Sequence, residues 1–204
     1  MKRSEITKQN ILKAAEQAFS EKGLYGARID EIAELAGANK RMIYAYYGNK
    51  EQLYTAVLDE VYSRMADKEK ELLNRELDCE EMIKCVIQHY FSFLHETPAF
   101  VRMVMWENLN EAKYLKQSNA RNIKGAAIEL MEKALENGIK NGVFRQDLNI
   151  PETIISINMF CFSYFSNKYT MTQIMQTDFG GKKETELRRE HVTEIILNYI
   201  KKRS

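Results

Sequence analysis

Cysteine and histidine are scarce in this 204-residue chain, and their spacing does not match a metal site or a disulfide framework. The cysteines are odd in number and form no C-x-x-C pair, and the histidines form no H-x-x-x-H pair. These residues are Cys79, Cys85, Cys161, His89, His95 and His191. The sequence therefore predicts neither a structural metal site nor a fold stabilised by disulfide bonds, and it implies no cofactor.

Proline, glycine and long apolar runs are scarce as well. Two prolines and nine glycines, all near the expected ends of helices or in turns, are typical of an all-helical chain. The first ten residues are polar, and no apolar run reaches about eighteen residues, the length of a membrane span. We therefore expect an all-α, cytoplasmic protein with no membrane partner.

Neither sign of charge dominates the whole chain, but the charge is unevenly distributed. The formal net charge is +1, whereas residues 1–50 hold nine Lys or Arg and six Asp or Glu, which leaves −2 for the remainder. This excess is too small to identify a nucleic-acid partner by itself. The positive excess becomes informative because it lies in the segment that also contains the helix pattern described next.

Residues 28–53 have the pattern of two short helices joined by a tight turn. Apolar residues recur at helical spacing until Gly37 breaks the pattern, and Ile43 and Tyr47 resume it four residues apart. Gly37 suits the left-handed position beyond a helix end, and Asn39 can cap the helix that follows. A three-residue turn of this kind is typical of a helix-turn-helix.

The second helix is suited to DNA if Ile43 and Tyr47 face inward. Its outer face is then cationic and phenolic, and no Asp or Glu occurs from Leu35 to Lys50. Lys and Arg contact phosphates and guanine edges, and tyrosines contact phosphates and thymine methyl groups. Lys50, at the start of the next helix, is a candidate phosphate clamp. A merely solvated face is the alternative. The candidate DNA-binding residues are Arg28, Asn39, Lys40, Arg41, Met42, Tyr44, Tyr46 and Lys50.

Residues 7–58 resemble the N-terminal domain of TetR-family transcriptional regulators along their whole length. The matching motifs are I-L-x-A-A at the start, I-x-x-I-A-x-x-A-G in the middle and K-E-x-L at the end. The chain departs from the family where Ala27 and Arg28 stand in place of the usual Ser or Thr, and where Arg41 replaces a frequent Gly. The resemblance implies a DNA-binding regulator that is not an enzyme, and the two arginines leave its base preference open.

Helical periodicity along the rest of the chain predicts about nine helices. The first is expected to end at Lys22-Gly23, a fourth to begin after Asn49 and run to about Leu73, and a long helix to cover residues 113–140. We expect residues 1–48 to form the helix-turn-helix domain and residues 49–204 a helical domain for ligand binding and dimerisation. The fourth helix has no Pro or Gly, so it can act as a lever between the two.

The last two expected helices favour a homodimer. The helix opened by Pro151 is apolar almost all round, and the final helix is apolar on one face, as a four-helix interface between two subunits requires. The resemblance also implies dimerisation through these helices. Packing within one chain is the alternative. The candidate interface residues are Ile157, Cys161, Tyr164, Val192, Ile195, Ile196 and Tyr199.

An apolar middle region, residues 79–176, resembles the ligand-binding domain of the family less specifically. Apolar and aromatic walls with a few polar groups are what a small-molecule site needs. The candidate ligand-binding residues are Phe93, Met103, Trp106, Glu107, Asn108 and Phe165. Alternatively, Glu107 and Asn108 brace neighbouring helices, because buried polar groups need partners.

Together these observations predict a one-component repressor. It would bind a palindromic double-stranded DNA operator as a homodimer and be released by an unknown small-molecule effector. The competing hypothesis is a helical enzyme or protein-interaction module that carries a helix-turn-helix. No nucleophile–base pair or phosphate-binding glycine loop supports that hypothesis.

Overall fold

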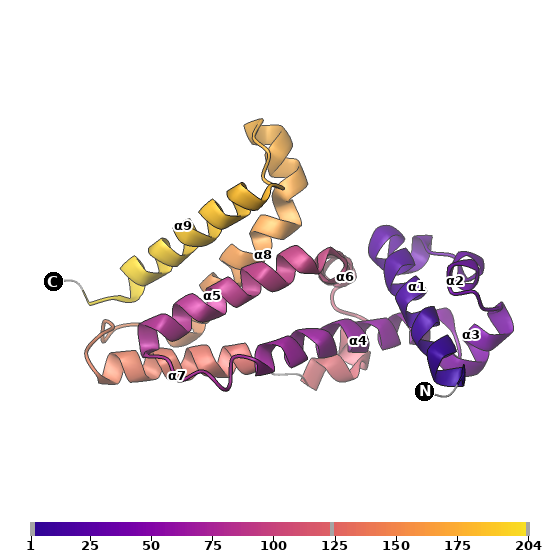
Figure 1. The fold of residues 1–204 in the computed structure, drawn as a ribbon, viewed down its shortest axis with the longest axis horizontal. Helices are drawn as coiled ribbons and strands as arrows, with labels where there is room; N and C mark the ends of the chain where they lie inside the picture. Colours follow the sequence, from indigo (N-terminus) through magenta and orange to yellow (C-terminus); the bar gives the residue numbers. More distant parts are fainter. Residues whose placement is uncertain (1–2, 123–124, 203–204) are drawn as a thin grey trace. The chain divides into compact units, whose positions relative to one another are not determined.

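The computed structural model describes residues 3–122 and 125–202 (Figure 1). In these ranges it contains nine α-helices and two short 3-10 helices, and the only β pairing is one bridge between Phe144 and Lys201. The helices are α1 (Arg3–Gly26), α2 (Ile29–Leu35), α3 (Lys40–Tyr47), α4 (Lys50–Lys70), α5 (Cys79–Glu96), α6 (Pro98–Leu109), η1 (Leu115–Gln117), η2 (Asn119–Asn122), α7 (Ala126–Lys140), α8 (Ile150–Met175) and α9 (Lys182–Ile200). The all-α prediction is confirmed.

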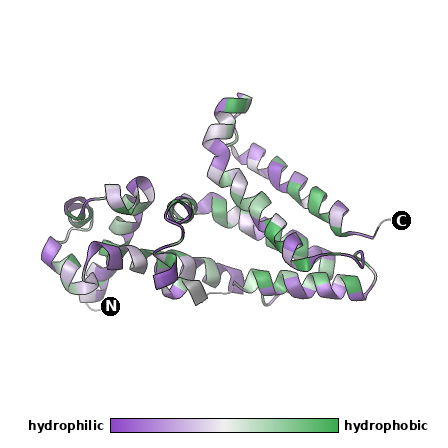
Figure 2. Cartoon of the chain, turned by 180° about the vertical axis from the view of Figure 1, so that it is seen from behind, coloured by the Kyte–Doolittle hydropathy of each residue, from purple (hydrophilic) through white to green (hydrophobic). Residues whose placement is uncertain are grey.

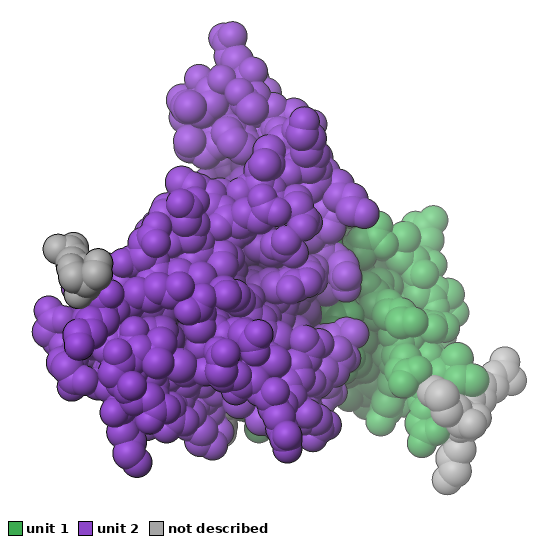
Figure 3. All heavy atoms as spheres, turned by 60° about the vertical axis from the view of Figure 1, so that its left-hand side comes forward, with its two compact units in different colours: residues 1–64, 98–123 green, residues 65–97, 124–204 purple. Residues whose placement is uncertain are grey.

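The chain packs as two compact units (Figure 3). The first comprises residues 1–64 and 98–123, with α1 to α3, most of α4, α6, η1 and η2. The second comprises residues 65–97 and 124–204, with the end of α4 and helices α5, α7, α8 and α9. These units are defined by packing, whereas the division expected at residue 48 concerns function and stays a prediction.

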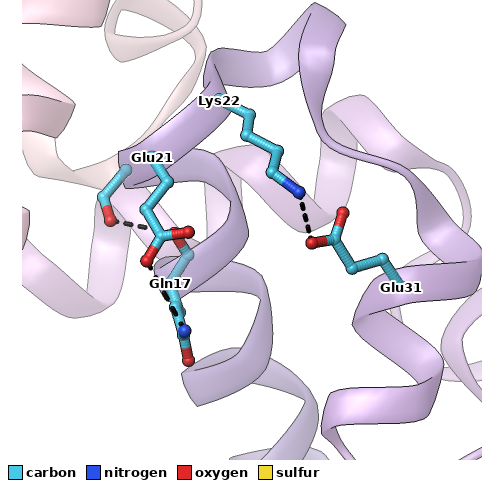
Figure 4. A network of polar contacts seen from close by, with 5 residues as sticks. Gln17, Glu21, Lys22 and Glu31 are labelled. Carbon is cyan, nitrogen blue, oxygen red and sulfur yellow. Dashed lines mark hydrogen bonds and ion pairs between the residues drawn. The ribbon is translucent and has the colours of Figure 1, made fainter.

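In the first unit, α1 packs against α2 and α6. Its buried stripe includes Ile11, Ala15 and Phe19, as the apolar spacing predicts. Lys22 of α1 forms an ion pair with Glu31 of α2, next to a hydrogen bond between Gln17 and Glu21 (Figure 4). Both partners of the ion pair are partly exposed, so apolar burial contributes more to this packing than the pair does.

Gly23 interrupts α1 close to the end that the sequence predicts. Its φ of 67° lies in the left-handed region, where a Cβ is unfavourable. A Cβ at this position would also lie 3.0 Å from carbon atoms of the Trp106 ring. Glycine therefore allows both the sharp change of direction and the close approach of the indole.

The long helix expected over residues 113–140 is wrong in its first half. Glu111 and Ala112 have positive φ values, and short 3-10 helices follow before α7 begins at Ala126. Two acidic side chains accept backbone N–H groups of this segment. Glu107 accepts from Leu115 at 2.7 Å, and Asp59 of α4 accepts from Ala120 at 3.1 Å. Tertiary partners thus satisfy donors that a helix would otherwise pair.

In the second unit, α5 packs against α7, α8 and α9. Asp78 caps α5 by accepting from the Glu81 backbone N–H at 2.8 Å. At the other end of α5, the Thr97 hydroxyl donates to the carbonyl of Phe93, in the last turn of the helix. Hydrophobic and hydrophilic residues alternate along the helices (Figure 2). Among the described residues, none of the helices combines the length and the hydrophobicity of a membrane span.

Candidate nucleic-acid interface

The turn between α2 and α3 has the local geometry that its residues predict. Gly37 has a φ of 59°, and the Ala38 N–H donates to the carbonyl of Ala33 at 2.9 Å, which closes the end of α2. The Asn39 side chain then accepts from the Met42 N–H at 2.9 Å and caps α3. Ile43 is fully buried, so the orientation of α3 is fixed by its inner face.

The outer face of α3 presents the predicted DNA-binding side chains. Lys40, Arg41 and Tyr44 are exposed, and Met42 and Tyr46 are half-buried. Tyr47 lies on the inner side, where its hydroxyl donates to the Lys8 carbonyl at 3.0 Å and burial raises its pKa. The face therefore carries two cations and two phenols next to one another in sequence, which is a suitable set for phosphate and base contacts.

Two partners of this face could not be found from the sequence pattern. Asp30 of α2 pairs with Lys40 at 2.6 Å, although the segment around α3 itself contains no acid. The ammonium group of Lys8, on α1, lies 5.2 Å from the centre of the Tyr46 ring, within cation–π range. Only the packing of α1 and α2 reveals that these side chains belong to the site.

Arg28 and Lys50 flank the motif. Arg28 is exposed at the N-cap position of α2, where its side chain makes no capping hydrogen bond. Lys50 begins α4, and partial burial lowers its pKa. Asn49 and Gln52 exchange hydrogen bonds, with Asn49 accepting from the Gln52 N–H at 2.8 Å and Gln52 accepting from the Asn49 N–H at 3.1 Å. This capping box fixes the start of the helix that carries Lys50.

The predicted ligand-binding residues are divided between the two units. Met103, Trp106, Glu107 and Asn108 belong to the first, and Phe93 and Phe165 belong to the second. Trp106 donates to the Ser20 carbonyl at 3.2 Å, Glu107 accepts from Leu115, and Asn108 donates to the Val104 carbonyl of its own helix at 2.9 Å. Glu107 thus contacts η1, outside its own helix, whereas the hydrogen bond of Asn108 lies within α6. A ligand-binding role for the six residues stays a prediction.

Of the predicted interface residues, four are part of the core of their own chain. Ile157, Cys161, Val192 and Ile196 are each at most 2% exposed. These four side chains therefore pack within their own chain, and an interface role for the seven residues stays a prediction. Ile195 and Tyr164 are half-buried, and Tyr199 is 46% exposed against the guanidinium of Arg145.

The site contains a capped turn, a buried anchor at Ile43 and an exposed cationic face, which together define a helix-turn-helix protein. In the described residues, no group of three or more His, Cys, Asp or Glu could hold a metal ion.

Comparison with known proteins identifies the family. The sequence model described as "Bacterial regulatory proteins, tetR family" matches residues 11–57, and that described as "Tetracyclin repressor-like, C-terminal domain" matches residues 80–196. The chain therefore belongs to the TetR family and is a DNA-binding transcriptional regulator, not an enzyme.

Individual relatives agree with this assignment. The chain is 33% identical over 177 residues to the HTH-type transcriptional repressor NicS of Pseudomonas putida, covering 86% of this chain and 84% of NicS. The fold is similar to that of the fatty acid degradation regulator FadR from Bacillus halodurans, with a TM-score of 0.71, 23% identity and 93% of each chain covered. FadR from Bacillus subtilis, in complex with stearoyl-CoA, gives a TM-score of 0.66 at 20% identity and covers 95% of this chain and 99% of FadR.

Proposed function

We propose that this regulator is a repressor that binds a palindromic operator as a homodimer and is released by a small molecule. The observation that carries the proposal is the outer face of α3, where Arg41 and Tyr44 are exposed on a helix held by Asn39 and Ile43. The name of the relative NicS supports repression rather than activation.

The exposed apolar side chains of α8 support dimerisation. Ile155 and Met159 are 52% and 55% exposed, one turn apart on the side of the helix away from the buried Ile157 and Cys161. Apolar side chains gathered on one side of a helix favour association, because burial removes them from water. A two-fold dimer presents two α3 helices related by symmetry, and a palindromic operator matches that symmetry.

Release follows if a ligand binds better to a conformation that holds the two α3 helices at the wrong spacing. The ligand then shifts the population away from the DNA-binding conformation. A coupling of about 1–3 kcal/mol would weaken operator binding roughly 5- to 150-fold. The B. subtilis FadR structure, a complex with stearoyl-CoA, supports a regulatory ligand in this fold but does not identify the ligand of this chain.

The test is a selection of duplex DNA from a random pool by the purified protein. A two-fold symmetric consensus would support both DNA binding and the dimer. A consensus without symmetry would contradict the homodimeric arrangement, and an absence of enrichment would contradict operator binding. The selected duplex then serves as the operator for all later measurements.

Two variants separate phosphate contacts from base contacts at this operator. Lys50→Ala should weaken binding to all duplexes equally and lower the salt slope by roughly one unit, because one phosphate contact is lost. Arg41→Ala should add a sequence-dependent loss of about 1–3 kcal/mol at one position if the guanidinium reaches a base. Lys13→Ala, which removes an exposed lysine from α1, is the matched control for lost charge. A salt titration in which Lys50→Ala matches the wild type would refute the phosphate clamp.

A further inference from the structure

Two contacts hold the N-terminal part of α1 against the C-terminal end of α3 (Figure 1). The hydroxyl of Tyr47 donates to the backbone carbonyl of Lys8 at 3.0 Å, and the ammonium group of Lys8 lies 5.2 Å from the centre of the Tyr46 ring. Lys8 precedes Tyr47 by 39 positions in the sequence, so only the fold brings it to this helix. The two tyrosines at the end of α3 thus fix both the backbone and the side chain of one lysine from α1.

The charge of Lys8 is available to another molecule. Lys8 is exposed, and within the described residues its ammonium group forms no ion pair with an acid. Lys40, at the other end of α3, differs in this respect, because Asp30 pairs with it at 2.6 Å. An aromatic ring attracts an ammonium group without neutralising its charge, so Lys8 keeps a full positive charge beside α3.

The position of Lys8 suits a phosphate contact better than a base contact. In a helix-turn-helix, the first residues of the second helix contact base edges, whereas neighbouring elements hold the duplex by its phosphates. The rise from Lys40 to Tyr46 is about 9 Å along the helix axis, so Lys8 lies at the opposite end from those first residues. A lysine, with a compact charge on a flexible stem, can reach a phosphate oxygen from there.

We propose that Lys8 binds a phosphate of the operator and that Tyr46 positions the ammonium group of Lys8 through the face of its ring. The proposal rests on the proposed function and adds a DNA contact from outside the helix-turn-helix. It also assigns Tyr46 a role that does not depend on its hydroxyl. The ring keeps a flexible side chain on the α3 side of α1 before DNA binds, so less conformational freedom is lost on binding.

A salt titration of the full-length protein on the selected operator tests the phosphate contact. Lys8→Ala should weaken binding to operator and non-operator duplexes equally and lower the salt slope by roughly one unit for each bound subunit. The loss should therefore shrink roughly 3.5-fold per subunit between about 50 and 200 mM salt. Lys8→Arg keeps the charge and the contact with the ring, so it should bind like the wild type. Lys13→Ala removes an equal charge from an exposed position of the same helix and should keep the wild-type slope.

Two substitutions of Tyr46 separate its ring from its hydroxyl. Tyr46→Phe keeps the ring and should bind the operator like the wild type. Tyr46→Leu removes the ring and should weaken binding, by no more than Lys8→Ala does. In the Lys8→Ala background, Tyr46→Leu should have no further effect, because the lysine that the ring positions is already absent. If thermal unfolding shows that Tyr46→Leu is unstable, Tyr46→Met takes its place, since methionine also lacks a ring.

Each part of the proposal can fail on its own. A wild-type salt slope in Lys8→Ala, or an equal decrease of the slope in Lys13→Ala, would overturn the phosphate contact. Equal losses in Tyr46→Phe and Tyr46→Leu, no loss in Tyr46→Leu, or a loss that persists without Lys8 would overturn the positioning role of the ring. All of these results require a wild-type protein that binds its selected operator, whereas failure of the proposed function would leave the wild type without one.

Discussion

The ion pair between Asp30 and Lys40 occupies a lysine of the α3 face, and we expect it to limit the affinity of that face for DNA. Lys40 can contact a phosphate only if it leaves Asp30, and the carboxylate of Asp30 is itself repelled by the phosphate backbone. Asp30→Asn removes both effects and keeps the shape of the side chain. We expect this variant to bind DNA more tightly than the wild type, with equal gains for operator and non-operator duplexes.

The magnitude follows from the exposure of the pair. The two groups lie 2.6 Å apart, and their side chains are 51% and 59% exposed. Exposed ion pairs contribute about 0.2–1 kcal/mol, so breaking this one costs about 1.4- to 5-fold in affinity. Asp30→Asn should lower the free energy of unfolding only slightly, because Asp30 lies in the first turn of α2, where an acid contributes about 0.3–1 kcal/mol through the helix dipole.

A double-mutant cycle measured by fluorescence anisotropy tests this reasoning. Lys40→Ala, Asp30→Asn and the double variant are compared with the wild type at two salt concentrations. The gain from Asp30→Asn should fall by more than half in the Lys40→Ala background and should shrink at high salt, where exposed charges are screened. A gain that is equally large with and without Lys40 would refute a role for the ion pair. No gain at low salt would place Lys40 away from the phosphates.

Three other predictions concern the stability of the first unit and the proposed dimer. Asn39→Ala should lower the free energy of unfolding by about 1 kcal/mol through loss of the α3 cap, which chemical denaturation will measure. Gly23→Ala should lower the free energy of unfolding by about 1–3 kcal/mol, because alanine is strained in a left-handed backbone and its methyl group meets the Trp106 ring. The fluorescence of Trp106, the single tryptophan of the sequence, reports the change. Met159→Glu should yield a folded monomer by sedimentation, whereas Ile196→Glu, at a position 2% exposed, should unfold the chain. A dimeric Met159→Glu protein would place the interface elsewhere.

The helix-turn-helix could be predicted from the sequence because its determinants are local. Gly37 supplies the left-handed turn, Asn39 caps the following helix, and Ile43 anchors it, all within seven residues. Each of these effects depends on backbone preferences or on hydrogen bonds between near neighbours. None of these determinants depends on residues far away in the sequence, so the two helices and their turn appear where the sequence predicts them.

The segment before α7 shows why local pattern fails elsewhere. Its residues have helical periodicity, but the carboxylates of Glu107 and Asp59 take up backbone donors of Leu115 and Ala120. Asp59 lies 61 residues before Ala120, so no window of sequence reveals the competition. The same limit applies to α8, where periodicity cannot decide which side of an apolar helix packs within its own chain. Ile157 is buried within its own chain, and for this reason we propose the opposite side of the helix, with Ile155 and Met159, as the interface. Long-range packing thus decides what local preference leaves open.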